Sequence, residues 1–244
     1  LVSWMTGPAR LRSRILDMVD TLVVVSDAQA DTARRLFGFA PGRLAVIPNI
    51  VAAPYFDCSA SSLAGDTADD GYVLCTGNIC ARKNQLNLVK AALAAGCPLL
   101  IIGDVLTGEE QYGAELARLT QGQSSVRWLP AMPAESPELV AAYKRARVFA
   151  LPSFEETQPI CLLEAAAARK ALVISDAPYA AQSYYRDARR VDPKSVSSIA
   201  DGLRAALAQP AHYTPPVSSL DDCRYERVGQ SYRRVFEVVM SAAH

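Results

Sequence analysis

The sequence predicts an α/β protein built on a doubly wound parallel sheet, and two features of the chain lead to that prediction. From Tyr72 onward, short runs rich in β-branched residues alternate with longer stretches of helical periodicity. The short runs are apolar throughout, which indicates strands that helices bury on both faces. We therefore expect one doubly wound domain from about residue 70 to 208, with its ligand outside the carboxyl ends of the strands.

Most of the expected strands are apolar runs that stop at glycine, proline or serine. These runs cover residues 72–77, 98–103, 148–152 and 171–175, and shorter strands that contain arginine are expected at 126–129 and 189–191. A further strand, Thr21 to Val25, comes earlier in the chain and has no obvious partner. Because the chain also lacks an initiator methionine, we expect it to be a piece of a longer protein.

Helical spacing fills the gaps between these strands, and local signals mark several helix ends. The helix after the first buried strand runs until Gly96, which is placed as a C-terminal cap. Ser136 and Pro137 form an N-cap and a first-turn proline. Other helices are expected at 109–119, from about Pro159, from Asp192-Pro193, and along an apolar stripe from Tyr225 to Val239.

The composition excludes several functional classes. Half of the 244 residues are hydrophobic and a fifth are charged, as in ordinary globular proteins. The 25 basic and 25 acidic side chains cancel, so nothing favours binding to nucleic acid or anionic lipid. No apolar run approaches the roughly 18 residues that span a bilayer. The six cysteines show no CxxC spacing, which predicts reduced thiols of a cytosolic protein and no zinc site.

The segment GNICARKNQ, Gly77 to Gln85, is the first candidate for ligand binding. A strand stops at Gly77, and Arg82 and Lys83 lie where the next helix begins. A helix N-terminus with two cations suits a phosphate or diphosphate. Taken alone, a solvated Arg-Lys pair is the more common explanation. The loop is not GxGxxG, so it does not predict a dinucleotide.

Two more segments follow predicted strands. The loop Leu129 to Glu135 could present backbone groups to a nucleobase, but on the sequence alone a plain surface connection is the better explanation. In PSFEETQPICLLEA, Glu156 lies in a loop, Pro159 is placed as the first helical residue and Glu164 lies just over one turn into the helix. Both carboxylates can face one ligand, and carboxylates suit paired sugar hydroxyls. The alternative is that both glutamates are exposed to solvent and only interact favourably with the dipole of the helix.

Together, in this order and spacing, these segments resemble retaining glycosyltransferases of the family 4 type. That family has the GT-B fold of two facing Rossmann-like domains. The resemblance runs from about residue 20 to 241. It is carried by VVVSDAQADTARRLFGFAPGRLAVIPNIV, YVLCTGNICARKNQLNLVKA and VFALPSFEETQPICLLEAAAARKALVIS, the last with the family's Glu-x7-Glu motif.

The resemblance implies a role for each matching residue. Arg82 and Lys83 would bind the donor diphosphate, Glu156 would face the donor sugar near the reacting carbon, and Glu164 would bind the ribose hydroxyls. The remaining residues expected to contact the donor are Gly77, Asn78, Thr157, Gln158, Ile160 and Cys161. The family needs no metal or other cofactor, and the sequence has no Asp-x-Asp triplet. No histidine base is expected, since His212 and His244 lie near the C-terminus.

The resemblance also divides the chain. Residues 1–50 would be a remnant of the N-terminal acceptor domain, 51–71 a linker, 72–220 the donor-binding domain, and 221–244 a helix that braces the missing domain. That missing domain would bind a glycan or lipid-linked acceptor, as in polysaccharide biosynthesis. It would hold a cytoplasmic protein at the inner face of the membrane. Without it, we expect this piece to be inactive and to self-associate through exposed apolar surface.

Two departures from the family pattern keep other functions open. Thr157-Gln158-Pro159 stands where Gly-Phe-Gly is frequent, and Pro159 lacks an N–H donor. Asn78 stands where arginine is common. The leading hypothesis is retaining transfer of a sugar from a nucleoside-diphosphate sugar. The alternatives are a non-catalytic nucleotide- or glycan-binding module and a GT-B-shaped epimerase or phosphorylase.

Overall fold

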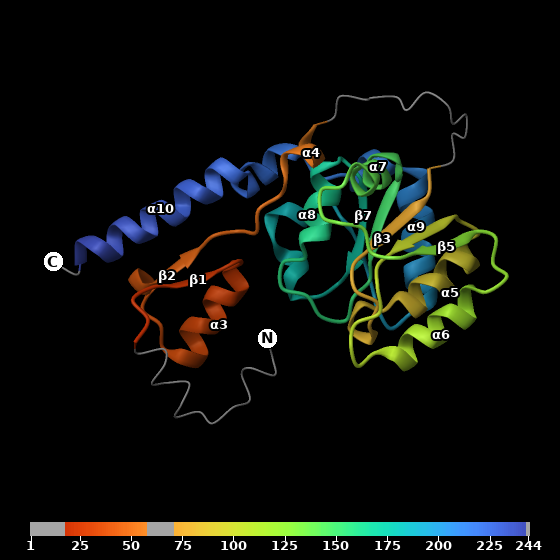
Figure 1. Ribbon diagram of the computed structural model, residues 1–244, viewed down its shortest axis with the longest axis horizontal. Helices are drawn as coiled ribbons and strands as arrows, with labels where there is room; N and C mark the ends of the chain where they lie inside the picture. The colour runs from red at the N-terminus through yellow and green to blue at the C-terminus, as the bar shows by residue number, and fades with distance from the viewer. Residues whose placement is uncertain (1–17, 58–70, 243–244) are drawn as a thin grey trace.

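Six parallel strands form the main sheet of the protein in the computed structural model, which describes residues 18–57 and 71–242. The strands are β3 (Val73–Thr76), β4 (Leu99–Ile102), β5 (Val126–Leu129), β6 (Val148–Leu151), β7 (Ala171–Ser175) and β8 (Arg189–Val191). Their order across the sheet is β5-β4-β3-β6-β7-β8, so the order reverses between β3 and β6 (Figure 1). This is the doubly wound arrangement that the sequence predicts.

Helices cover both faces of this sheet. One face carries α5 (Gln85–Ala95), α6 (Glu110–Thr120) and α9 (Val196–Ala208), and α5 contacts both of the others. The other carries α7 (Pro137–Arg145), α8 (Ile160–Ala167) and the short α4 (Ala53–Phe56). Every residue of β3, β6 and β7 is buried between the two layers, and this burial accounts for their largely apolar sequences.

A second, smaller unit precedes this domain. It contains β1 (Leu22–Val24), α3 (Asp27–Phe37) and β2 (Leu44–Val46), and the two strands pair in parallel. The stretch predicted as a linker, residues 51–71, begins with packed structure, because Val51 bridges to Arg224 and Tyr55 of α4 is fully buried. Residues 58–70 of that stretch lie outside the described part of the chain.

The local signals placed some helix ends correctly and others not. Ser136 caps α7 by accepting from the N–H of Leu139, and Gly96 ends α5 with a φ of 69°, both as predicted. Pro159 is the N-cap of α8 and not its first helical residue. The helix predicted from Asp192 begins instead at Val196, because the Asp192 carboxylate accepts from the N–H of Lys194 in a turn and Ser195 provides the cap.

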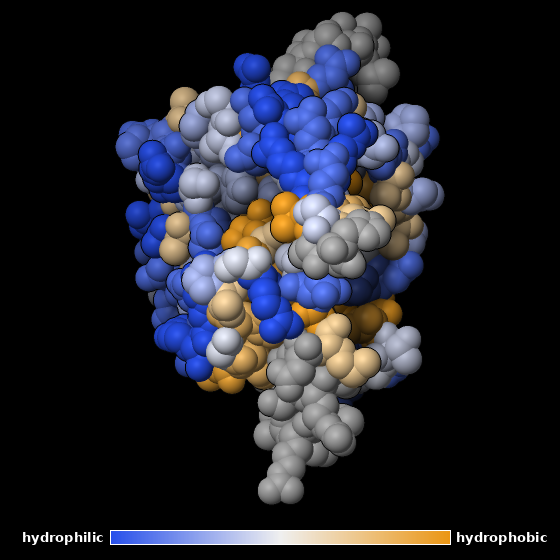
Figure 2. All heavy atoms as spheres, turned by 90° about the vertical axis from the view of Figure 1, so that its left-hand side faces the viewer, coloured by the Kyte–Doolittle hydropathy of each residue, from blue (hydrophilic) through white to orange (hydrophobic). Residues whose placement is uncertain are grey.

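The last helix, α10 (Tyr225–Ala242), extends away from the main domain and leaves much of its apolar stripe uncovered (Figure 1). Figure 2, which views the molecule from the side of β1, β2 and α10, shows apolar atoms among polar ones on this face. The large exposed apolar side chains of α10 are Tyr225, Tyr232, Phe236, Val238 and Met240. Self-association through this surface stays a prediction. Within the described residues, no helix is both long and apolar enough to cross a membrane.

The ends of β3 and β4 approach so closely that a side chain does not fit between them. A Cβ added to Gly103 would lie 2.0 Å from the carbonyl oxygen of Gly77. We therefore expect Gly103→Ala to lower the free energy of unfolding by about 1–3 kcal/mol, as overpacked substitutions do. Urea-induced unfolding measures this.

Gly229→Ala is the matched control, because an added Cβ meets nothing within 4 Å on α10. It should raise the free energy of unfolding by about 0.5–1 kcal/mol, the difference between glycine and alanine inside a helix. Equal stability of Gly103→Ala and the unchanged protein would contradict the close approach.

Candidate functional site

The candidate site lies where the strand order of the main sheet reverses. The chain leaves β3 at Gly77 and leaves β6 at Pro152, and these two parallel strands are neighbours. Their carboxyl ends therefore bring the segments Gly77–Gln85 and Pro152–Cys161 together at one edge of the sheet. A switch point of this kind is the usual ligand crevice of an open parallel sheet.

Three charged side chains meet in this crevice. Oε1 of Glu156 lies 3.0 Å from Nζ of Lys83 and 3.0 Å from a terminal guanidinium nitrogen of Arg82. The Glu156 and Lys83 side chains are only 8% and 11% exposed, whereas that of Arg82 is 47% exposed. Both contacts are ion pairs by distance, without hydrogen-bond geometry at Oε1. The site thus has a buried ion pair with a second, half-exposed cation at its rim.

A short turn positions the two cations. Residues Ala81–Lys83 form a 3-10 turn that ends at Asn84, whose φ of 61° is unusual for a residue other than glycine. The Asn84 amide donates to the carbonyls of Pro152 and Pro193, at 2.9 and 2.7 Å. These bonds compensate for the strained backbone and attach the turn to the end of β6.

Further hydrogen bonds join the cationic turn to the Glu156 loop. The N–H of Phe154 donates to the carbonyl of Arg82 at 2.9 Å, and the Arg82 guanidinium donates to the carbonyl of Glu155 at 2.7 Å. The two segments are therefore held in register on both sides of the ion pair.

Burial sets the protonation of the cluster. The Cys161 thiol lies beside Lys83, and burial raises its pKa to about 11, so that it is neutral at pH 7. Burial alone would lower the pKa of Lys83, but the neighbouring Cys161 and Glu156 groups outweigh it and the pKa is raised. Since the thiol is protonated at neutral pH, Glu156 is the anion that keeps Lys83 charged.

Glu164 lies on α8, the helix that follows the Glu156 loop. Its Oε2 accepts a hydrogen bond from the Tyr143 hydroxyl at 2.7 Å, and that hydroxyl lies 2.6 Å from Oγ1 of Thr76 at the end of β3. Burial raises the pKa of Glu164, while the bond from Tyr143 opposes the shift. A chain of hydrogen bonds from the end of β3 thus fixes one oxygen of the carboxylate.

The other residues expected to contact the donor lie around this cluster. Gly77 has a φ of 129°, and a Cβ there would lie 3.5 Å from Nζ of Lys83. Asn78 is exposed and its carbonyl accepts from the Gln85 amide. Ile160 is 48% exposed at the start of α8, where the first N–H groups of the helix have no intrahelical acceptor. Contact with a donor stays a prediction for each of them.

Thr157 and Gln158 have more constrained surroundings. The Gln158 amide bonds to Val25, Asn49 and Gln182, and the Thr157 carbonyl accepts from the Gln182 amide. The groups of Gln158 that would contact a ligand are therefore already bonded to protein. Its assignment to donor binding stays a prediction that these contacts do not favour.

Several residues that shape the site were not predicted from the sequence. Most of the buried polar residues of the described chain gather here, namely Thr76, Lys83, Asn84, Gln85, Ser153, Gln158 and Ser175. Asn84 and Gln85 resemble an ordinary helix start, and Tyr143 resembles a core residue of α7. The signal that could have found them is their position beside the ends of β3 and β6.

The loop Leu129 to Glu135 leaves the edge strand β5 at the same edge of the sheet. Asp104, one residue past the Gly103 that follows β4, accepts from the N–H of Ala131 at 2.9 Å and shapes this loop. Glu135 has a φ of 63°, again unusual outside glycine. The interaction of this loop with a nucleobase stays a prediction.

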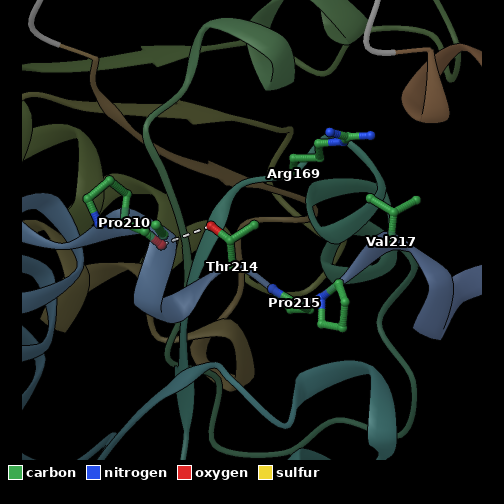
Figure 3. A pocket seen from close by; sticks show the side chains of 7 residues that line it. Arg169, Pro210, Thr214, Pro215 and Val217 are labelled. Carbon is green, nitrogen blue, oxygen red and sulfur yellow. Dashed lines mark hydrogen bonds between the residues drawn. The ribbon is translucent and has the colours of Figure 1, made fainter.

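A hollow of about 620 Å³ lies elsewhere, at the amino-terminal edge of the sheet. Arg169, Pro210, Thr214 and Val217 are among its lining residues, and Figure 3 shows the bond from the Thr214 hydroxyl to the Pro210 carbonyl. Arg169 comes just before the start of β7, so the hollow is opposite the candidate site. His212 lies in the same region, and His244 is outside the described residues.

Comparison with known proteins places these observations in a family. The family model described as "Glycosyl transferases group 1" matches residues 70–209, more than half of the chain. Among curated proteins, none matches the chain.

Solved structures share the fold at low sequence identity. A glycosyltransferase from Rickettsia africae ESF-5 superposes with a TM-score of 0.78 at 12% identity, over 95% of this chain and 66% of that one. Sucrose-phosphate synthase from Thermosynechococcus elongatus superposes with a TM-score of 0.75 at 19% identity, over 96% of this chain and 62% of that one. HepE from Anabaena, crystallised with UDP and glucose, gives 0.69 at 17%, over 96% and 66%. The chain thus has a GT-B type fold and spans less than two thirds of each of these structures.

Proposed function

Because this chain belongs to the glycosyl transferases group 1 family, we propose that it carries the donor-binding part of an enzyme that transfers a sugar from a nucleoside diphosphate. The observation that carries the proposal is the meeting of Lys83, Arg82 and Glu156 at the switch point of the sheet. Two cations and two carboxylates in one crevice suit a ligand with a diphosphate between two polyhydroxylated groups.

Each side chain has a place in the proposed reaction. Arg82 and Lys83 bind the diphosphate and stabilise the charge that develops on it as its bond to the sugar carbon breaks. Glu156 faces the sugar hydroxyls near that carbon, and Glu164 accepts hydrogen bonds from the ribose. The acceptor oxygen forms the new bond on the same face while its proton passes to the departing diphosphate oxygen, so the configuration of the sugar is retained. The reaction needs no metal or other cofactor.

The acceptor is proposed to bind outside the part of the protein present here. The family resemblance supports a glycan or lipid-linked acceptor, a hexose as the transferred sugar, and a cytoplasmic location close to the membrane. The chain covers at most 66% of the three superposed structures. We therefore propose that this portion binds the donor but does not turn it over by itself.

Titration calorimetry with UDP, GDP and ADP tests the proposal. UDP is the first choice, because HepE, of the same fold, was crystallised with it. We expect at least one of the three to bind, and Lys83→Ala to abolish that binding. The proposal is wrong if none binds, or if binding is unchanged in both Lys83→Ala and Glu164→Ala.

A non-catalytic binding module is the second candidate, and the surroundings of Gln158 and Pro159 favour it. The Gln158 amide is bonded to protein, and Pro159 offers no N–H at the start of α8. Such a module would bind the nucleotide, but transfer by the longer protein would survive Glu156→Ala. Loss of transfer in that variant would exclude this candidate.

A further inference from the structure

Gln158 makes more long-range hydrogen bonds than its loop position suggests, and it is only 5% exposed. Its Nε2 donates to the carbonyl of Val25 at 2.8 Å and to Oε1 of Gln182 at 2.9 Å. Its Oε1 accepts from the N–H of Asn49 at 2.7 Å, and its backbone carbonyl accepts from the Asn49 amide at 3.0 Å. Both side-chain hydrogens and the side-chain oxygen are therefore bonded to protein.

Gln158 and its partners Val25 and Asn49 lie at the same kind of edge in two different sheets. Val25 directly follows β1, and Asn49 follows β2 by three residues, so both lie at the carboxyl edge of the smaller sheet. Gln158 itself lies beyond β6, at the carboxyl edge of the larger sheet. The carboxyl edges of the two parallel sheets thus come close together at this point, and Gln158 joins them.

The loop that Gln158 anchors also carries Glu156. Only Thr157 separates them, and Glu156 lies against Lys83 on the other side of the crevice. The Gln182 amide holds the carbonyl of Thr157, the residue between them, at 2.8 Å. The loop is therefore fixed at one end by the ion pair and at the other by the Gln158 bonds.

Glu164 is held in place by residues other than Gln158. It belongs to α8 and is held by Tyr143 and, through it, by Thr76. A change at Gln158 should consequently alter the sugar side of the site more than the nucleoside side.

We propose that Gln158 is a positioning residue, which sets the place of Glu156 by tying its loop to the carboxyl edge of the β1–β2 sheet. This inference rests on the proposed function for the sugar-facing role of Glu156, but the anchoring itself does not. Removal of the Gln158 amide leaves the Val25 carbonyl, the Asn49 N–H and the Gln182 amide oxygen without their partner.

The first measurement is amide hydrogen exchange in the ligand-free protein. The N–H of Phe154, bonded to the Arg82 carbonyl, reports on the loop. In Gln158→Leu we expect this amide to exchange about tenfold faster. Asn49→Ala, which removes one bond and keeps Gln158, should act in the same direction but more weakly.

Tyr72→Phe is the matched control. It removes one hydrogen bond, to the Ala142 carbonyl, at the opposite edge of the sheet. It should lower the melting temperature without accelerating the Phe154 amide. An unchanged Phe154 amide in Gln158→Leu, or equal acceleration in Tyr72→Phe, would overturn the proposal.

The second measurement compares UDP with UDP-glucose. In Gln158→Leu the affinity for UDP-glucose should fall about tenfold and that for UDP less than about threefold. An equal loss for both ligands would mean that Gln158 only stabilises the fold, and would overturn the positioning role. If the unchanged protein binds neither ligand, the proposed function fails, and hydrogen exchange still decides whether Gln158 anchors the loop.

Discussion

Lys83→Ala is expected to lower the free energy of unfolding by about 3 kcal/mol, because it leaves the Glu156 carboxylate buried without its main partner. Glu156 is 8% exposed and lies 3.0 Å from the lysine ammonium. Breaking a buried pair costs about 3–5 kcal/mol, and the lower end applies because Arg82 still faces the same oxygen. Urea-induced unfolding followed by circular dichroism measures the loss.

Two further variants show that the unpaired charge is the cause. Arg82→Ala should cost at most about 1 kcal/mol, since its guanidinium is 47% exposed. Lys83→Met combined with Glu156→Leu removes both charges and should recover most of the stability, as replacement of a whole buried pair does. If Lys83→Ala proves as mild as Arg82→Ala, the pair is not buried in solution.

Glu164→Gln is expected to weaken UDP binding by about tenfold to a hundredfold and to leave binding of inorganic pyrophosphate unchanged. The magnitude is that of hydrogen bonds to a charged group, about 1.5–3 kcal/mol. The difference between the two ligands follows from position, because pyrophosphate lacks the ribose that Glu164 is proposed to hold. Equal weakening for both ligands would contradict the assignment.

The same residue predicts how UDP binding depends on pH. Burial raises the pKa of Glu164, so its carboxylate becomes protonated at a higher pH than an exposed glutamate. UDP affinity should fall as the pH decreases through that raised pKa. Tyr143→Phe removes the bond that favours the ionised form and should move the midpoint to higher pH. Glu164→Gln should abolish this dependence.

The pH dependence that Glu164 gives to the free energy of unfolding should be opposite in sign to the pH dependence of UDP affinity. Between the ordinary glutamate pKa and the raised one, the folded protein retains a proton that the unfolded chain has released. The contribution of Glu164 to the free energy of unfolding therefore decreases as the pH rises through this window. Urea titrations across the window, with Glu164→Gln as reference, measure the effect.

The strands were predictable because each is a local pattern. A run such as ALVIS at 171–175 is apolar up to its final serine, and the structure buries all of it. The caps at Ser136 and Gly96 are local too, and both were predicted. The start of α9 was missed although it is local, because Asp192 uses its carboxylate in a turn and leaves the cap to Ser195.

The contacts inside the site were harder to predict from the sequence. The sequence predicted that Lys83 and Glu156 share one ligand, but not that they pair with each other across the crevice. The bonds of Gln158 reach residues 109 and 133 positions away, and no periodicity signals such a partner. Thr157-Gln158-Pro159 looked like a departure from the family pattern. In the structure, Gln158 forms hydrogen bonds with Val25 and Asn49 beside the β1–β2 sheet.

The close approach of Gly77 and Gly103 limits how this site can be redesigned. Since a methyl group at position 103 would lie 2.0 Å from the Gly77 carbonyl, that position is closed to any new functional group. In a mutant library designed to accept a different donor, substitutions at the end of β4 would therefore be unproductive. Diversity belongs in the exposed residues around Phe154 and Ile160 and in the loop after β5, where side chains already have room.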